Sequence, residues 1–185
     1  SFNSIYGKTL YEPSAVLPEN ETCNRLPGID GKAKMSKSLG NAIYISDTSE
    51  VIKEKVMKMY TDPNHINIGD PGKVEGNMVF TYLDAFARDD DFLEYAPEYK
   101  NLDEMKEHYR RGGLGDVKIK KFLINVLNRE FAPIRERRAY FENHIEEVIE
   151  ILKNGTEKAK NDADKVLTRV KKSMGINYFD DDTFI

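Results

Sequence analysis

The sequence predicts a mainly α-helical protein, in which a helical domain follows a short turn-rich segment. From residue 51 to about residue 174, apolar side chains recur every three or four positions, the spacing that places them on one face of a helix. Residues 1–45 instead hold several prolines and glycines, and only the pieces 9–11 and 42–45 have an extended character. We therefore expect residues 1–46 to be the remnant of an α/β domain and residues 47–175 to be a helical domain.

The first helix of the helical domain is expected to begin at Asp47. Asp47 and Glu50 have the three-residue spacing of a capping box, and apolar residues follow at helical spacing as far as Tyr60. This helix should end by Asp62, because the residue before a proline avoids the helical region. Residues 65–75 then form a connecting loop.

Three more helices are expected before residue 143. The first covers 78–88, and the second covers 102–111 and is ended by the glycine pair 112–113. Asp116 can cap the third, in which Pro133 should introduce a kink because proline lacks the amide donor. The third helix carries a core-facing apolar stripe of Ile119, Phe122, Leu123, Val126 and Leu127.

The C-terminal region is expected to hold two helices and a tail. Asn143 and Glu146 form a second capping-box signal, and Gly155 is expected to separate that helix from a last one that ends before Gly175. The tail, residues 176–185, mixes aromatic side chains with three consecutive aspartates. Disorder and docking of these aromatics onto the helical body are both compatible with this composition.

The segment 34–38, Lys-Met-Ser-Lys-Ser, carries the strongest functional signal in the chain. Glycines flank it at positions 31 and 40, and it alternates two lysines with two serines. Ammonium groups on flexible stems, hydroxyls and loop amides all suit phosphate oxygens that move during a reaction. Lysine and serine also occur in ordinary solvated loops, so the composition alone does not identify a site.

The complete string 34–38 is the signature of class I aminoacyl-tRNA synthetases. From about residue 26 to about residue 175, the chain resembles the carboxyl-terminal half of the bacterial tryptophanyl-tRNA synthetase family. The motifs that carry this resemblance are Met59-Tyr60-Thr61-Asp62-Pro63, Gly69-Asp70-Pro71-Gly72, Glu75-Gly76-Asn77 and Pro133-Ile134-Arg135-Glu136-Arg137-Arg138. The resemblance implies that the first 46 residues belong to a Rossmann-like catalytic domain and that the helical domain recognises the anticodon of tRNA(Trp).

The resemblance also implies a reaction and roles in it. The intact enzyme joins tryptophan to the α-phosphorus of ATP with the help of Mg²⁺, and then transfers the tryptophanyl group to tRNA. Lys37 is the stronger candidate for contacting the phosphates, with Lys34 as a second charge. Ser36 and Ser38 would donate hydrogen bonds, the backbone of Met35 would lie near the adenine, and the flanking glycines would act as hinges.

Parts of such an enzyme are missing from this sequence. None of the three histidines, at positions 65, 108 and 144, lies in the His-x-Gly-His type of motif that completes a class I ATP site, and no amino-acid pocket can be identified. The chain begins Ser1-Phe2-Asn3, in a segment that resembles the end of a helix. We therefore expect a piece of a longer enzyme that is inactive alone. The family is homodimeric, whereas the piece alone is compatible with a monomer.

One face of the helix after Asp116 is the candidate RNA contact. It carries positive charge and amide groups, which can donate to phosphates and read base edges. The residues are Lys118, Lys121, Asn125, Asn128 and Arg135. A solvated helix face would have a similar composition.

Composition limits the remaining possibilities. The net charge is −4, from 28 basic and 32 acidic residues, so overall charge gives no argument for nucleic-acid binding and local clusters must carry it. Cys23 is the only cysteine, which excludes a disulfide within the chain and a metal site made of cysteines. No protein-bound metal and no membrane segment are predicted, and a reducing cytoplasm fits best.

Two alternatives remain open on sequence grounds. One is a class I synthetase for another amino acid, above all tyrosine. The other is a helical RNA-binding or interaction module whose loop has no catalytic role. Testing whether the intact protein activates tryptophan or tyrosine separates the first alternative from a tryptophan-specific enzyme. An upstream His-x-Gly-His motif would argue against the second alternative.

Overall fold

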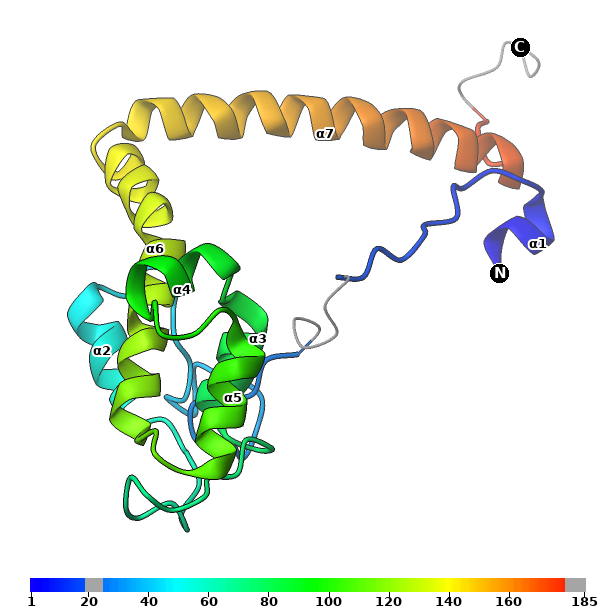
Figure 1. Cartoon of the computed structure of the whole chain (residues 1–185). Helices are drawn as coiled ribbons and strands as arrows, with labels where there is room; N and C mark the ends of the chain where they lie inside the picture. Colours follow the sequence, from blue (N-terminus) through cyan, green and yellow to red (C-terminus); the bar gives the residue numbers. More distant parts are fainter. Residues whose placement is uncertain (19–24, 179–185) are drawn as a thin grey trace. The chain divides into compact units, whose positions relative to one another are not determined.

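The computed structural model describes residues 1–18 and 25–178, and in these residues it is mainly helical (Figure 1). This confirms the predicted class. The extended pieces expected at 9–11 and 42–45 are not strands, and an isolated bridge between Pro27 and Lys34 is the β-type pairing in the described residues. The chain divides into two compact units, one of residues 17–139 and one that joins residues 1–16 to residues 140–185.

The larger unit packs four short helices with the first part of a long one. Helices α2, α3 and α5 lie around α6, and buried side chains from all of them form one apolar core (Figure 1). The stripe predicted on α6 is confirmed, because all five of its residues are buried. The helices of this unit are α2 (Ser49–Met57), α3 (Met78–Phe86), α4 (Asp89–Tyr95), α5 (Leu102–Arg111) and α6 (Asp116–Glu142).

The predicted N-cap of α2 is wrong by one residue. Thr48 is the N-cap, and its hydroxyl accepts a hydrogen bond from the backbone N–H of Val51 at 3.4 Å. Asp47 is used elsewhere, because its carboxylate accepts from the backbone N–H of Tyr44 at 2.8 Å and pairs with Lys55 at 2.5 Å. The carboxylate of Asp47 is therefore engaged away from the helix terminus.

Helix α2 ends at Met57, before the limit predicted at Asp62. The ammonium group of Lys120, which is buried on α6, donates to the backbone carbonyls of Met57 and Met59 at 3.0 Å each. A cation therefore satisfies carbonyl groups that the end of a helix leaves without partners. Burial lowers the pKa of Lys120, and Asp116 opposes this effect.

The helix predicted over 78–88 ends two residues early, because α3 ends at Phe86, and a helix that was not predicted, α4, begins at Asp89. The carboxylate of Asp91 accepts from the backbone N–H of Arg88 at 2.8 Å and so caps the new helix. The same carboxylate receives two hydrogen bonds from Arg129 of α6, at 2.9 and 2.6 Å. The acidic run 89–91 is therefore partly a structural element.

The bounds predicted for α5 are confirmed, whereas the role predicted for Asp116 is not. Its carboxylate lies at the start of α6 but accepts from the hydroxyl of Tyr109 at 2.7 Å and from the hydroxyl of Thr61 at 2.7 Å. His65 Nδ1 lies 3.1 Å from the same carboxylate. Asp116 thus connects three segments instead of capping its helix.

The second unit contains α1 (Phe2–Tyr6) and α7 (Ile145–Met174). His144 precedes α7 and makes no side-chain cap, so the predicted cap at Asn143 is wrong. Helix α7 also runs through Gly155 without a break, since one glycine costs only about 1 kcal/mol within a helix of good helix formers. Gly175 ends it in the left-handed conformation at φ 67°, as predicted.

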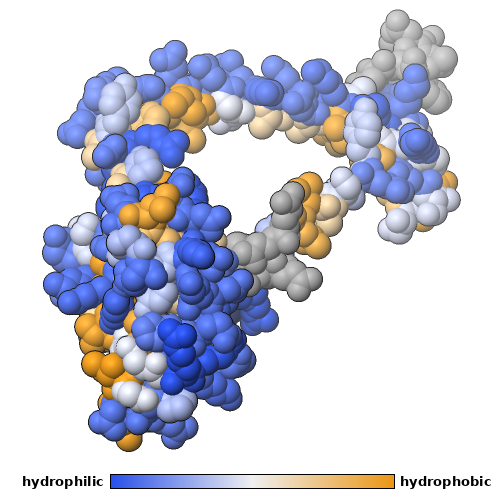
Figure 2. Space-filling view, in the orientation of Figure 1, coloured by the Kyte–Doolittle hydropathy of each residue, from blue (hydrophilic) through white to orange (hydrophobic). Residues whose placement is uncertain are grey.

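Helix α7 has no buried residue among those described, and its apolar side chains lie along one side (Figure 2). Within its own unit, the hydroxyl of Thr9 lies 2.8 Å from that of Ser173, and Arg169 lies over the ring of Tyr11 at 5.5 Å. No helix of the described residues is both long and apolar enough to cross a membrane. Most of the tail considered above, residues 179–185, lies outside the described residues, and so does Cys23.

The carboxylate of Asp116 offers a direct test of this packing. We expect Asp116→Ala to lower the free energy of unfolding by about 3 kcal/mol, because it leaves the buried hydroxyl of Tyr109 and the ring of His65 without their acceptor. Urea unfolding measures this loss. Asp103→Ala on the exposed first turn of α5 is the matched control and should stay within about 0.5 kcal/mol of the parent. Equal losses in the two variants would contradict the role given to Asp116.

Candidate functional site

The segment 26–41 folds back on itself through its own backbone. The N–H of Gly28 donates to the carbonyl of Ala33 at 2.7 Å, and the N–H of Ile29 donates to the carbonyl of Asn41 at 3.0 Å. Gly31 and Gly40 adopt positive φ angles of 68° and 63°, which side chains with a Cβ avoid. The glycines predicted as hinges are therefore the points where the chain turns, and the segment closes into a defined loop.

The side chain of Asn41 lies inside this loop and is only 3% exposed as a residue. Its Oδ1 accepts from the backbone N–H of Ser36 at 2.8 Å. Its Nδ2 donates to the carboxylate of Asp30 at 3.2 Å and to the backbone carbonyl of Lys34 at 3.3 Å. A Cβ on Gly28 would lie 2.2 Å from this Nδ2, so the amide occupies the space that glycine leaves open.

Asp30 completes the hydrogen bonding within the loop. Its carboxylate also accepts from the backbone N–H of Lys32 at 3.3 Å. Partial desolvation by itself would raise the pKa of Asp30, but the hydrogen bonds from Lys32 and Asn41 outweigh it and lower the pKa. Asp30 is therefore ionised at neutral pH and acts as an acceptor.

Three contacts attach the loop to the helices. The backbone N–H of Tyr60 donates to the carbonyl of Ile29 at 3.0 Å, and the hydroxyl of Tyr82 on α3 donates to the carbonyl of Pro27 at 2.7 Å. The side chain of Met35 is half-buried and packs against the apolar core. Desolvation, with a smaller contribution from the charge of Asp30, raises the pKa of Tyr82, so its hydroxyl remains a donor.

The lysines of the loop face solvent. Lys34 and Lys37 are both exposed, and neither forms an ion pair with any residue that the structure describes. The hydroxyls of Ser36 and Ser38 lie 2.9 Å apart. The five residues predicted to bind ATP therefore share one loop that offers two unpaired cations and two hydroxyls. Such a surface can hold an anion with several oxygens.

The five residues predicted on α6 lie on one stripe of the helix but have different surroundings. At 100° per residue, positions 118, 121, 125, 128 and 135 fall within an arc of roughly 100°. Lys121 and Asn125 are exposed, and neither has a polar partner among the described residues. Lys118 pairs with Glu98 at 2.5 Å, and hydrogen bonding to this carboxylate raises the pKa of Lys118. Lys118 and Lys121 also line a shallow cavity of about 380 Å³.

Asn128 and Arg135 instead connect α6 to the start of α2. The Oδ1 of Asn128 accepts from the hydroxyl of Ser49 at 2.8 Å and from the guanidinium of Arg135 at 3.2 Å. Arg135 also donates to the backbone carbonyl of Asp47 at 3.3 Å. Both side chains therefore have structural partners within the protein, and contact with RNA at these positions stays a prediction.

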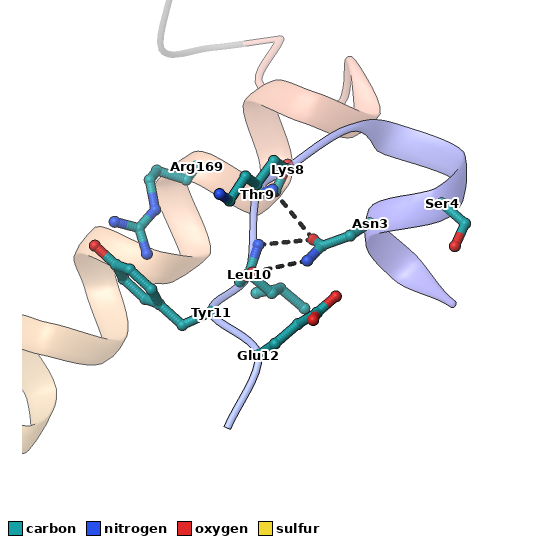
Figure 3. A pocket seen from close by; sticks show the side chains of 8 residues that line it. All are labelled: Asn3, Ser4, Lys8, Thr9, Leu10, Tyr11, Glu12 and Arg169. Carbon is teal, nitrogen blue, oxygen red and sulfur yellow. Dashed lines mark hydrogen bonds between the residues drawn. The ribbon is translucent and has the colours of Figure 1, made fainter. Parts of the chain in front are cut away.

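A cavity of about 820 Å³ lies in the unit of α1 and α7, and none of the predicted site residues lines it (Figure 3). Both polar atoms of the Asn3 side chain are hydrogen-bonded there, because Oδ1 accepts from the N–H groups of Thr9 and Leu10 and Nδ2 donates to the carbonyl of Leu10. The cavity is lined by Asn3, Ser4, Lys8, Thr9, Leu10, Tyr11, Glu12 and Arg169.

Sequence reasoning missed the polar centre of the loop, which is Asn41 with Asp30. Both lie within the glycine-bounded segment, and the only signal in the sequence is an amide residue directly after Gly40. No group of three or more potential ligands within residues 1–18 and 25–178 is arranged to hold a metal ion.

Known proteins are similar to this chain over most of its length. The model of the family described as tRNA synthetases class I (W and Y) matches residues 3–132. Two proteins named tryptophan–tRNA ligase, from Streptococcus pyogenes serotype M3 and from Clostridium longisporum, are 56% and 59% identical over 180 residues, or 97% of this chain. Those residues are 51% and 50% of the two proteins, so the chain spans about half the length of the curated relatives it matches.

A solved structure is also similar. It is the tryptophanyl-tRNA synthetase of Campylobacter jejuni complexed with ADP and tryptophan, with a TM-score of 0.69 and 25% sequence identity. The match covers 94% of this chain and 50% of the other.

The crowding at Gly28 predicts the effect of a single methyl group. We expect Gly28→Ala to lower the free energy of unfolding by about 1 to 3 kcal/mol, because the new Cβ must displace the amide of Asn41. Gly69→Ala is the matched control, since a Cβ there would meet no atom within 4 Å. The measurement is urea unfolding of both variants, and a Gly28→Ala variant as stable as the control would contradict the packing described for the loop.

Proposed function

This chain belongs to the family of class I tRNA synthetases for W and Y, and we propose that it is the carboxyl-terminal part of a tryptophan–tRNA ligase. The observation that carries the proposal is the identity of 56% and 59% to proteins of that name over 180 residues. The exposed, unpaired lysines of the loop supply the chemistry that such an enzyme needs.

The role proposed for the loop is to hold the phosphates of ATP. Lys37 would be the main phosphate contact and Lys34 a second one, and both ammonium groups are available because no described residue pairs with them. Ser36 and Ser38 would donate their hydroxyl protons, and the backbone of Met35 would face the adenine while its side chain stays anchored in the core. The neighbouring solved structure with ADP supports the choice of nucleotide.

In the intact enzyme, the carboxylate of tryptophan would attack the α-phosphorus of ATP, and pyrophosphate would leave. The tryptophanyl group would then pass to tRNA(Trp). Charge moves onto the pyrophosphate during the first step, and Mg²⁺ bound to ATP would share that charge with the two lysines. Positioning and charge stabilisation are the main contributions that a protein can make to this kind of step.

Tryptophan is favoured over tyrosine as the amino acid. The family includes enzymes for both, but the relatives given above are named as tryptophan enzymes. The residues that would bind tryptophan, and most of those that would bind adenosine, belong to the part of the enzyme outside this sequence. We therefore propose that the piece alone is inactive, and that the complete enzyme is a cytoplasmic homodimer.

We also propose a function for each part of the chain. Residues 1–46 would belong to the catalytic domain, residues 47–175 would bind the anticodon region of tRNA(Trp), and residues 176–185 would be a tail. Lys121 and Asn125 are the best placed of the five candidate RNA contacts, because their side chains are exposed and have no partner among the described residues. Lys118, Asn128 and Arg135 would first have to give up contacts within the protein.

Removing the charge of Lys37 tests the proposed role of the loop. In the complete enzyme, Lys37→Ala should lower tryptophan-dependent pyrophosphate exchange by about 10²- to 10³-fold, because a charge that stabilises the leaving pyrophosphate is lost. Tryptophan binding should change much less. The matched control is Lys32→Ala, an exposed lysine of the same loop, which should retain most of the exchange activity. Equal exchange rates in Lys37→Ala and the parent would refute the assignment.

Lys121 provides the corresponding test for RNA. Lys121→Ala should weaken binding of the anticodon stem-loop of tRNA(Trp) and reduce the slope of log affinity against log salt by about 1, because one phosphate contact is lost. Titrations at several salt concentrations measure both quantities. Lys53→Ala, which removes an exposed lysine of α2, is the control and should leave the slope unchanged. The same small effect from both variants would indicate a non-specific contribution of charge.

A further inference from the structure

We propose that Asn41 is a positioning residue for the phosphate-binding loop, and that its side-chain amide fixes the backbone from which Lys34 and Lys37 extend. This inference rests on the proposed ATP role of the loop. It adds a residue that would set the positions of the phosphate-binding lysines without binding the phosphates itself. Asn41 would not touch the nucleotide. It would act through Ser36, Lys34 and Asp30.

The side-chain amide of Asn41 is hydrogen-bonded through both of its polar atoms. Asn41 accepts from the N–H of Ser36 and donates to the carbonyl of Lys34 and to the carboxylate of Asp30, at 2.8, 3.3 and 3.2 Å. Both polar atoms of a buried amide are thus used, and a buried amide without these partners would be costly. The contacts hold the loop at three points. Lys34 and Ser36 lie on either side of Met35, and Asp30 lies across the turn.

These side-chain contacts also stay within the loop. The described partners of the Asn41 side chain lie at positions 30, 34 and 36. The helical core is held by other groups, such as Asp116 and Lys120. A role in general stability alone would not require an amide that binds the backbone of two candidate phosphate ligands, Lys34 and Ser36.

The two lysines of the loop depend on their backbone for their position. Neither Lys34 nor Lys37 has a partner among the described residues that would fix its side chain. The region that their ammonium groups can reach is therefore set by their backbone positions. Asn41 binds the backbone of Lys34 directly, and the N–H of the adjacent Gly40 donates to the carbonyl of Lys37 at 3.2 Å.

The experiment uses the 185-residue chain and inorganic tripolyphosphate as the probe. Asn41→Leu removes all polar contacts at similar volume. Asn41→Asp keeps an acceptor for Ser36 but places a second carboxylate beside Asp30. The double variant Asp30→Asn with Asn41→Asp exchanges the amide and the carboxylate. An amide donor at position 30 then faces a carboxylate acceptor at position 41. Affinity is measured by calorimetry, and hydrogen exchange of the Ser36 amide reports on the loop.

We expect Asn41→Leu and Asn41→Asp each to accelerate exchange of the Ser36 amide and to weaken tripolyphosphate binding by about 10-fold, and the double variant to recover a large part of both. Lys37→Ala should weaken binding but leave the Ser36 amide protected. The rescue separates positioning from general destabilisation, because the double variant carries more changes than Asn41→Asp and yet should bind better.

Two results would overturn the inference while the ATP role stands. One is unchanged affinity in Asn41→Leu together with weaker binding in Lys37→Ala. The other is a double variant that binds no better than Asn41→Asp. If neither Lys34→Ala nor Lys37→Ala weakens binding, the proposed function fails, and the positioning role fails with it. These patterns differ, so the two proposals are judged separately.

Discussion

The placement of the Lys-Met-Ser-Lys-Ser loop depends on its attachment to the helical unit. The carbonyls of Pro27 and Ile29 accept from the hydroxyl of Tyr82 and the N–H of Tyr60, and these two tyrosines belong to α3 and to the segment before it. The N–H of Met78 at the start of α3 donates to the carbonyl of Tyr60 at 3.1 Å. The loop is therefore one compact unit with α2 to α6, and a displacement of α3 must move the base of the loop.

Two polar side chains organise this unit, the buried amide of Asn41 and the partly exposed carboxylate of Asp116, and they work in the same way. Asn41 gathers backbone groups of the loop, while Asp116 gathers the side chains of Tyr109, Thr61 and His65 from segments far apart in sequence. Each group satisfies donors that burial would otherwise leave without partners, which would cost about 1 to 3 kcal/mol apiece. The aromatic rings around Asp116 add contacts, since the rings of His65 and Tyr109 meet edge to face at 4.7 Å.

Sequence patterns predicted the elements whose signals are local. The stripe on α6 follows from its 3.6-residue period, and the end of α5 follows from Gly112, which adopts a φ of 87°. The errors arose where contacts outside the helix decide. Asp91 binds Arg129 and Asp116 binds Thr61, both far away in the chain, whereas Asp47 is engaged nearby by Tyr44 and Lys55.

The candidate site, too, could be predicted only where its signal is local in the sequence. The string 34–38 could be found from sequence, because its residue types alone describe its chemistry. Asn41 could not, because nothing in the sequence indicates that its amide turns inward to meet Ser36 and Asp30. Gly155 illustrates the opposite error, since a residue with a strong local preference was overruled by the good helix formers around it.

Charge pairing explains why a chain of net charge −4 can still offer sites for anions. The lysines and arginines that join the helices are mostly neutralised, as Arg129 is by Asp91 and Lys118 by Glu98. Lys34 and Lys37 on the loop and Lys121 on α6 keep their charge without a partner among the described residues. An anion approaching these three positions gains attraction without first breaking an ion pair. The net charge of the whole chain therefore says little about what the loop or the helix can bind.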